Sequence, residues 1–261
     1  MKPLTKGDHL GLDSGSIIFH MNFSIRDTGL QERMDDPECD DVLLWNTYHQ
    51  FTRVNRLFVG WYGIYRRLIR PSLRDCERTH TLLDLGCGGG GMLPVLQRWA
   101  HQDGFDLNLT GIDTDPRFMS YVGEQTWPVG ISFRVCSSTD LVREGSRFDV
   151  VICNHVIHHL ADQAVRQLLD EVKMMTDRVA VISDPVRSRF AYVLFSMVAV
   201  PLFRNSFIVE DGQFSIRRSF RPAELRQLAP SDWDIVTRFP YRQFLVYRAP
   251  DSPHGRGRRA S

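Results

Sequence analysis

A cluster of glycines directly after an acidic residue could form part of a cofactor site. Residues 82–91 read LLDLGCGGGG, so Asp84 stands two positions before the first glycine. Glycine lets a backbone turn sharply and approach a ligand closely, because it has no Cβ. The next segment predicts a helix over residues 91–100, whose N-terminal amides would face the same loop. We therefore expect Asp84 and the glycine loop to line a ligand pocket.

Two classes of cofactor fit such a loop. Gly86, Gly88 and Gly91 satisfy the G-x-G-x-x-G spacing of dinucleotide-binding proteins, in which the loop holds a pyrophosphate. A carboxylate at Asp84 would repel a pyrophosphate and attract a cationic cofactor, such as one that carries a sulfonium and an α-amino group. Asp84 therefore counts against a nicotinamide-dependent oxidoreductase, which stays as the alternative enzyme class.

The elements that must position these residues alternate between strand and helix, which predicts a mostly parallel sheet. The last two strands are close enough in sequence to pair antiparallel through a turn at Pro240. Ligands of such sheets bind beyond the carboxyl ends of the strands, where the strand order reverses. Asp84, Asp113, Ser137 and Asn154 all fall at predicted strand ends. The predicted strands are residues 81–85, 107–113, 131–136, 148–154, 179–183, 233–239 and 242–248.

Three segments in this order resemble the class I S-adenosylmethionine-dependent methyltransferases, in the style of ubiquinone-pathway and polyketide-tailoring enzymes. Asp84, Gly86 and Gly88 resemble their first motif, and residues 111–115 resemble their second strand, which ends in an acidic residue. Residues 148–160 are similar to their fourth strand and the His-His turn after it. The resemblance implies a Rossmann-like α/β fold with a seven-stranded, mostly parallel sheet, helices on both faces, an antiparallel last strand and helical lid elements.

The resemblance also implies S-adenosyl-L-methionine as the cofactor, with Asp113 accepting hydrogen bonds from the ribose hydroxyls. After the third strand the family usually has an acidic residue that faces the adenine amino group. Here Ser137 takes that position, and Asp140 is the nearby alternative. The cofactor-binding residues that we expect are Asp84, Gly86, Cys87, Gly88, Gly89, Asp113, Thr114, Ser137, Ser138 and Asn154.

Methyl transfer depends mainly on holding the acceptor close to the methyl group and excluding water. An alcohol or amine acceptor also needs a base, which His155, His158 or His159 could supply near neutral pH. A histidine after a buried strand can equally be a structural residue, so both roles stay open. The sequence contains no recognisable cluster of metal ligands, and we expect no metal.

The composition is that of a globular enzyme with a small substrate. The chain has 261 residues, 43% of them hydrophobic and 24% charged, enough for a large α/β core. A net charge of +1 gives no reason to expect nucleic acid as a partner. Five cysteines without metal-type spacing favour a reducing, cytoplasmic location, and no signal peptide is evident. We expect a monomer or a homodimer.

The chain divides into a central domain and flanking segments. We expect a partly disordered extension at residues 1–38, a helical lid that selects the substrate at 39–77, a methyltransferase domain at 78–250 and a disordered basic tail at 251–261. Aromatic residues recur at helical spacing in the lid segment, where they either line the acceptor pocket or only cover the sheet.

An apolar insertion over residues 184–221 contains the strongly apolar stretch 190–203. This stretch is shorter than the roughly 20 residues that a membrane-spanning helix needs. It predicts a buried lid helix and no integral membrane span. A weak interfacial contact with a lipid surface is the alternative.

These observations together favour methyl transfer to a small, largely apolar acceptor of aromatic or polyketide-like type, with oxygen as the first choice of target atom. Carbon methylation of a quinone or lipid-like acceptor is an alternative. A cofactor-binding protein without catalytic activity is another.

Overall fold

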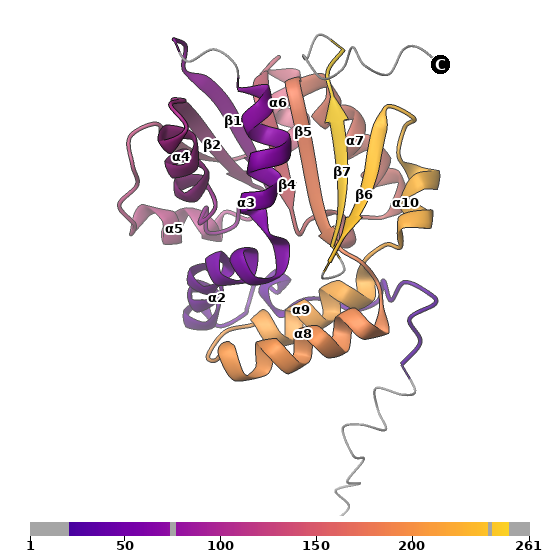
Figure 1. Ribbon diagram of the computed structural model, residues 1–261. Coiled ribbons are helices and arrows are strands. Elements are labelled where there is room, and N and C mark those ends of the chain that lie inside the picture. The colour runs from indigo at the N-terminus through magenta and orange to yellow at the C-terminus, as the bar shows by residue number, and fades with distance from the viewer. Residues whose placement is uncertain (1–20, 74–76, 240–241, 251–261) are drawn as a thin grey trace, which may run out of the picture.

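The computed structural model describes residues 21–73, 77–239 and 242–250, and its centre is a seven-stranded sheet (Figure 1). The strand order is β3-β2-β1-β4-β5-β7-β6, and β7 runs antiparallel to both of its neighbours. The predicted strands are all present, whereas the predicted turn at Pro240 lies outside the described residues. The strands are β1 (His80–Leu85), β2 (Leu107–Asp113), β3 (Ile131–Val135), β4 (Phe148–Asn154), β5 (Thr176–Pro185), β6 (Trp233–Arg238) and β7 (Arg242–Arg248).

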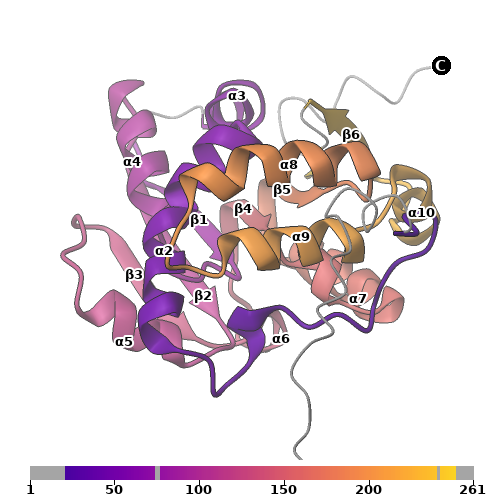
Figure 2. The same cartoon turned by 90° about the horizontal axis from the view of Figure 1, so that it is seen from below.

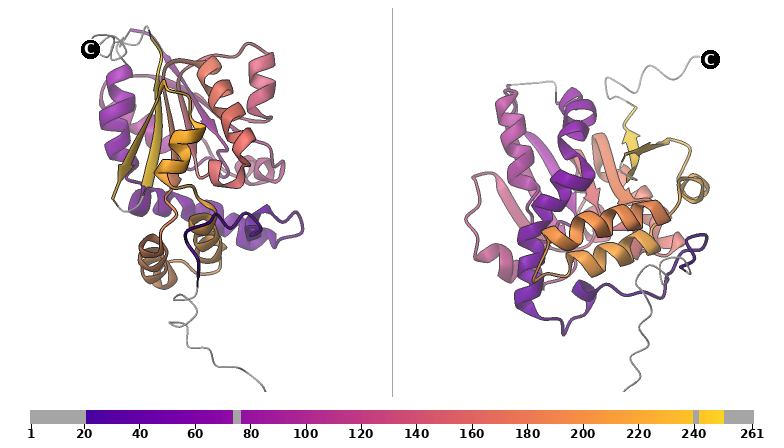
Figure 3. Two further views of the ribbon diagram at one scale, coloured as in Figure 1. Left: turned by 90° about the vertical axis from the view of Figure 1, so that its right-hand side faces the viewer. Right: turned by 60° about the horizontal axis from the view of Figure 1, so that its bottom comes forward.

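Helices cover both faces of the sheet, as expected (Figure 3). Neighbouring residues of the central strands point to opposite faces, so Leu82 packs in one core cluster and Leu83 in another. The cluster around Leu82 contains residues of α3 (Trp61–Ile64) and α4 (Leu93–Gln102). The cluster around Leu83 contains residues of the helices on the other face, which are α6 (Ser138–Arg143), α7 (Asp162–Met175) and α10 (Pro222–Leu228).

A third group of helices lies across the carboxyl ends of the parallel strands (Figure 1). It consists of α2 (Asp41–Val54), α8 (Arg189–Leu202) and α9 (Ile208–Arg218). Seen from below, α8 and α9 run side by side, and they are in contact (Figure 2). The Asp40 side chain caps α2 by accepting a hydrogen bond from the Leu43 amide at 2.9 Å. The remaining short helices are η1 (Arg33–Asp35), η2 (Asn55–Val59), η3 (Tyr65–Ile69), η4 (Arg70–Ser72), α5 (Arg117–Gly123) and η5 (Ile157–His159).

The helix α8 forms where the apolar stretch predicted it, but the expectation that it is buried was wrong. Ala191, Tyr192 and Ala199 are buried, whereas Met197 on another side of the helix is 71% exposed. The helix packs mainly against α9, so only part of its surface has a neighbour. Further exposed apolar side chains on α8 are Phe190, Val200 and Leu202.

A buried carboxylate joins the amino ends of three strands at the end of the sheet opposite to α8 and α9. Asp149 of β4 accepts hydrogen bonds from the Thr81 amide at 3.0 Å and from Arg178 Nε at 2.9 Å, and it also pairs with Arg78. Burial alone would raise the pKa of Asp149, but the hydrogen bonds from Thr81 and the Arg78 guanidinium hold it below its ordinary value.

We predict that Asp149→Asn lowers the free energy of unfolding by about 2–4 kcal/mol at pH 7, because it leaves two arginines without their shared anion. Asp177→Asn is the matched control. Asp177 forms a half-exposed ion pair with Arg147, so its loss costs less than about 1 kcal/mol. Urea unfolding measures both.

The Asp149 effect also has a defined pH dependence. The pKa of Asp149 is lower in the folded protein than in the unfolded chain. The stabilisation that Asp149 contributes is therefore fully present above the pKa of the unfolded chain, and it is lost as the pH falls through the pKa of the folded protein. The difference between the wild type and Asp149→Asn should therefore shrink towards pH 3. A constant difference, or equal costs for the two variants, would contradict this account.

Candidate functional site

A cavity of about 640 Å³ lies at the carboxyl ends of the strands, where the order reverses between β1 and β4. Its walls come from the loops after β1, β2, β3 and β4 and from α2, α7, α8 and α9. The ten residues that the sequence predicts as cofactor ligands all line it. They are Asp84, Gly86, Cys87, Gly88, Gly89, Asp113, Thr114, Ser137, Ser138 and Asn154.

The glycine loop is packed too tightly for larger residues. The amides of Gly86 and Cys87 both donate to the Ile112 carbonyl at 2.9 Å, which ties the loop to β2. Gly86 has a left-handed φ of 68°, and a Cβ there would lie 2.5 Å from Val156 Cγ2. A Cβ on Gly89 would lie 2.5 Å from the Cβ of Tyr48 on α2. The loop therefore reaches the cavity as bare backbone.

Asp84 places a carboxylate in this cavity without a partner from the protein. The residue is 4% exposed, and no hydrogen bond reaches its carboxylate from the part of the chain that the structure describes. Burial, and then the nearby charge of Asp113, raise the pKa of Asp84 to about 8. A buried carboxylate of this kind is costly unless a cation or a donor from a ligand completes it.

Asp113 is the last residue of β2. Its carboxylate accepts hydrogen bonds from the backbone and can still accept further ones from a ligand. Its Oδ2 accepts from the Gly88 amide at 2.9 Å, and its Oδ1 accepts from the Asp115 amide at 3.1 Å. Burial nevertheless raises the pKa of Asp113 above its ordinary value. Each carboxylate oxygen keeps a second lone pair that can accept a hydroxyl from a ligand in the cavity.

The end of β3 differs from the simplest expectation. Ser137 caps α6: its hydroxyl donates to Asp140 Oδ2 at 2.6 Å and accepts from the Asp140 amide at 3.2 Å. Asp140 is committed to the same capping box, and 47% of its side chain is exposed. Ser137 therefore lines the cavity with its hydroxyl engaged in the capping box, whereas Asp140 is not among the residues that line the cavity.

An acidic residue that the sequence analysis missed lies close to this position. Glu171 of α7 lines the cavity and accepts hydrogen bonds from Ser138 at 2.5 Å, Thr139 at 2.7 Å and Gln167 at 2.8 Å. These bonds outweigh burial and lower the pKa of Glu171, so the group is an anion. The sequence pattern gives no sign that Glu171 lies beside the end of β3, because Glu171 follows Ser138 by 33 residues.

At the end of β4, a chain of polar contacts fixes Asn154 and His155. Asn154 donates to Asn55 Oδ1 at 2.8 Å and accepts from Arg242 at 3.1 Å. The same guanidinium donates to His155 Nε2 at 3.1 Å. Burial, and then the charge of Arg242, lower the pKa of His155 well below its ordinary value, so this imidazole is neutral. His155 also has a left-handed φ of 60°, which is uncommon outside glycine.

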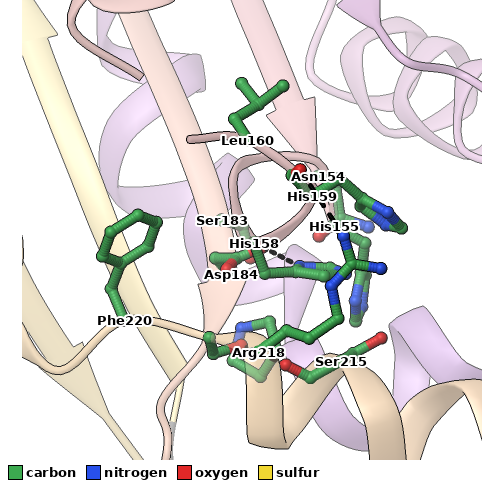
Figure 4. A network of polar contacts seen from close by, with 12 residues as sticks. Asn154, His155, His158, His159, Leu160, Ser183, Asp184, Ser215, Arg218 and Phe220 are labelled. Atoms are coloured by element: carbon green, nitrogen blue, oxygen red, sulfur yellow. Dashed lines mark hydrogen bonds and ion pairs between the residues drawn. The ribbon is translucent and has the colours of Figure 1, made fainter. Parts of the chain in front are cut away.

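The three histidines of the β4 turn have different surroundings (Figure 4). His158 is fully buried outside the cavity, and its Nδ1 and Nε2 contact Asp184 at 2.7 Å and Glu32 at 3.1 Å. Burial opposes its protonation, but the two carboxylates prevail and raise the pKa of His158 to about 9. Both nitrogens are occupied, so His158 does not reach a ligand in the cavity as a base.

His159 does line the cavity, together with acidic residues that the sequence analysis did not single out. Its Nδ1 lies 3.0 Å from Asp35 Oδ2, and its Nε2 lies 3.7 Å from Glu32 Oε1. Asp211 of α9 is also on this wall, where burial and neighbouring carboxylates raise its pKa to about 7. Glu32 and Asp35 arrive from a segment more than 120 residues away in the sequence, which explains why no local pattern predicted them.

The rest of the cavity wall is apolar. In the segment 39–77, Tyr65 packs into the core beside the sheet, Trp61 belongs to the same core cluster and also reaches the cavity, and Tyr48, Phe51 and Phe58 line the cavity. Leu194 and Phe195 of α8 complete this wall, and Phe58 meets Phe195 with ring centroids 5.1 Å apart. The aromatic segment therefore both covers the sheet and lines the pocket.

Comparison with protein families matches residues 83–178 to a methyltransferase domain. Among curated proteins, a ubiquinone biosynthesis O-methyltransferase of Methylobacterium sp. (strain 4-46) is 31% identical over 86 residues, which are 32% of each chain. The enzyme of the same description from Cereibacter sphaeroides is 34% identical over 95 residues, 34% of this chain and 36% of that one. The matched region thus spans about a third of the length of these relatives.

Solved structures with a similar arrangement include a plantazolicin methyltransferase in complex with SAH, with 13% identity, a TM-score of 0.49 and coverage of 80% of this chain and 95% of that one. Another is the magnesium protoporphyrin IX methyltransferase of Synechocystis PCC 6803 with bound SAH. It has 16% identity and a TM-score of 0.46 over 81% of this chain and 88% of that one.

Residues 83–178 therefore match a methyltransferase domain, in line with the resemblance that the sequence motifs show. The seven-stranded Rossmann-like sheet agrees with this assignment. Asp84, Asp113 and the glycine loop fit S-adenosylmethionine as cofactor, since a buried carboxyl that has no hydrogen-bond partner among the described residues can ionise against the cationic groups of a ligand. Within the described ranges, every helix is too short or too polar to cross a membrane.

We predict that binding of S-adenosylhomocysteine is coupled to ionisation of Asp84. Its α-amino cation favours the carboxylate form of a group whose pKa is about 8 in the empty protein. Affinity should therefore rise by up to about tenfold per pH unit from pH 6 to 8 and then level off. Calorimetry of the wild type and of Asp84→Asn measures this, and the variant should bind weakly and lack that pH dependence.

The empty protein provides the control for this prediction. A carboxyl whose folded pKa lies above its unfolded value lowers stability progressively as the pH rises between the two. Asp84→Asn should therefore raise the melting temperature of the empty protein at pH 8.5 and have little effect near pH 4. The same pH dependence of binding in the wild type and the variant would contradict the account.

Proposed function

We propose that this protein transfers the methyl group of S-adenosylmethionine to a hydroxyl of a small, largely apolar acceptor. The observation that carries the proposal is the unpartnered Asp84 carboxylate, which lies in a cavity with a long apolar wall. The proposal starts from the methyltransferase domain at residues 83–178 and adds a small-molecule acceptor and its target oxygen.

The proposed cofactor position follows the order of the strand ends. Asp84 at β1 pairs with the α-amino group, Asp113 at β2 accepts from the ribose hydroxyls, and Glu171 near the end of β3 accepts from the adenine amino group. The backbone of the glycine loop contacts the amino acid portion. This arrangement is supported by the shared cavity and by the hydrogen-bonding capacity that Asp84 and Asp113 retain.

The proposed acceptor position is the part of the cavity near β4, α8 and α9. Phe51, Leu194 and Phe195 there favour an aromatic or polyketide-like compound. The exposed apolar side chains of α8, including Phe190 and Met197, support access to a lipid-like acceptor through an interfacial contact. A quinone methylated on carbon would fit the same walls and is the second candidate.

The bound cofactor supplies a methyl sulfonium, from which the acceptor oxygen takes the methyl group as the carbon–sulfur bond breaks and its electron pair stays on sulfur. The chain's residues position the acceptor, exclude water and receive its proton. His159, held by Asp35, faces the cavity and is the histidine of the β4 turn whose position suits this role. His155 is a positioning residue, because Arg242 occupies its Nε2.

A methyl-transfer assay with labelled S-adenosylmethionine tests the proposal. Hydroxylated aromatic acceptors with and without an apolar tail should be methylated, and mass spectrometry of the products should place the methyl group on oxygen. Asp113→Ala should weaken S-adenosylhomocysteine binding by about tenfold or more, because ribose contacts are lost. Asp106→Ala changes an exposed carboxylate and should have no effect.

Three outcomes would overturn parts of this proposal. Methyl groups found on carbon would favour the quinone-type reaction. Thermal stabilisation by NAD alone would favour an oxidoreductase. Tight cofactor binding without transfer to any extract of small molecules would favour a non-catalytic cofactor-binding protein.

The proposed adenine contact has its own test. S-inosylhomocysteine carries an oxygen in place of the adenine amino group, so it offers no donor to Glu171. We predict that the wild type prefers S-adenosylhomocysteine by roughly tenfold or more, and that Glu171→Gln loses most of this preference. Asp140→Asn is the control and should retain it. An equal preference for S-adenosylhomocysteine in Glu171→Gln and the wild type would show that Glu171 does not contact the adenine amino group.

A further inference from the structure

Two histidines and a glutamate converge at the wall of the cavity in a way that the proposed methyl transfer does not require. Glu32 precedes η1, and His158 and His159 belong to η5. One ligand atom from each of these three residues lies within 4.8 Å of the other two. Glu32 and His158 are buried and His159 is half-buried, so this cluster is not an ordinary group of surface charges.

Two carboxylates fix the orientation of the imidazoles of His158 and His159 through their Nδ1 atoms. Asp184 Oδ1 lies 2.7 Å from His158 Nδ1, and Asp35 Oδ2 lies 3.0 Å from His159 Nδ1. Each ring therefore directs its Nε2 towards Glu32. In a metal-binding histidine, a carboxylate usually holds one nitrogen and thereby sets the tautomer and the ring orientation, while the other nitrogen faces the metal. Here the second nitrogen of His158 faces Glu32 Oε1, the third residue of the cluster.

The three contacts on the glutamate meet at one atom. Glu32 Oε1 lies 3.1 Å from His158 Nε2, 3.7 Å from His159 Nε2 and 2.8 Å from the Ser215 hydroxyl. One carboxylate oxygen has about two lone pairs, which His158 and Ser215 already use, and His159 Nε2 lies nearby beyond hydrogen-bond distance. Ligands that share a metal at about 2.1 Å stand roughly 3.0–3.5 Å apart, which is close to the separations of Glu32 Oε1 from the two nitrogens.

We propose that Glu32, His158 and His159 form a binding site for a divalent transition metal ion. Two imidazole nitrogens and one carboxylate suit Zn²⁺, Co²⁺, Mn²⁺ or Fe²⁺ better than Mg²⁺ or Ca²⁺, which prefer oxygen ligands. The metal replaces the proton between His158 and Glu32. No sequence pattern points to this cluster, because Glu32 lies 126 residues before His158.

The site opens onto the acceptor part of the cavity. Glu32, His159 and Ser215 line the cavity, as do the carboxylates of Asp35 and Asp211. On the premise of the proposed methyl transfer, a metal held by these residues would lower the pKa of an acceptor hydroxyl that coordinates it. His159 would then hold the metal in place of acting as the base, and the proton would pass to a carboxylate of the same wall, such as Asp211.

Cobalt is the probe for the test, because Co²⁺ reports its ligands through visible absorption. The full-length protein, freed of metal with a chelator, should bind one equivalent of Co²⁺ with new absorption bands. His159→Gln should weaken this binding at least tenfold, and Asp35→Asn should weaken it by about 10–100-fold through the imidazole that it orients. His101→Gln is the matched control, since His101 is 82% exposed on the surface, and it should bind like the wild type.

Binding of S-adenosylhomocysteine is measured on the same samples, which separates this inference from the proposed function. Protein that binds S-adenosylhomocysteine but takes up no stoichiometric Co²⁺ would overturn the metal site and leave the methyl transfer standing. Equal Co²⁺ affinity in His159→Gln and the wild type would also overturn it. Stoichiometric Co²⁺ that Zn²⁺ displaces and that depends on His159 would support it, whatever the acceptor is.

Discussion

The site depends on one electrostatic constraint, which is a carboxyl group held inside the protein with no hydrogen-bond partner among residues 21–73, 77–239 and 242–250. Asp84 lies on a central strand between β2 and β4, and burial raises its pKa to about 8. Asp149, at the other end of the sheet, has the opposite arrangement. The Thr81 amide and two arginines bind it, and despite burial the contacts from Thr81 and Arg78 hold its pKa below the ordinary value. The contrast indicates that Asp149 maintains the fold, whereas Asp84 is kept for a ligand.

The parallel sheet makes this arrangement possible because it brings the ends of several strands to one place. Residues from β1, β2, β3 and β4 meet at the cavity although they are spread over some 70 positions of the sequence. The glycine loop brings its backbone close to α2, and α8 and α9 close the cavity from below. Asn154, His155 and Arg242 connect the cavity wall to β7, so the antiparallel strand also helps to position it.

The sequence predicted the strands and their polar ends well, because both are local signals. Apolar runs followed by Asp84, Asp113 or Asn154 reveal a buried strand that ends at a polar crevice. Glu32, Asp35, Glu171 and Arg242 could not be found in this way, because their roles arise only from contacts between residues far apart in the sequence.

The sequence also did not predict the exposure of α8, since hydrophobicity predicts a helix but does not show which neighbours cover it. For His158 the sequence left a catalytic and a structural role open, and the buried pairing with Asp184 and Glu32 favours the structural one.

The central claim is that Asp84 stays largely uncharged until a cationic ligand arrives. A ¹³C NMR titration of the aspartate carboxyl carbons, assigned with Asp84→Asn, measures this in the empty protein and in the complex with S-adenosylhomocysteine. The account predicts a pKa of Asp84 of about 8 in the empty protein and a clearly lower value in the complex. An ordinary pKa near 4 in the empty protein, or an unchanged value after binding, would contradict it.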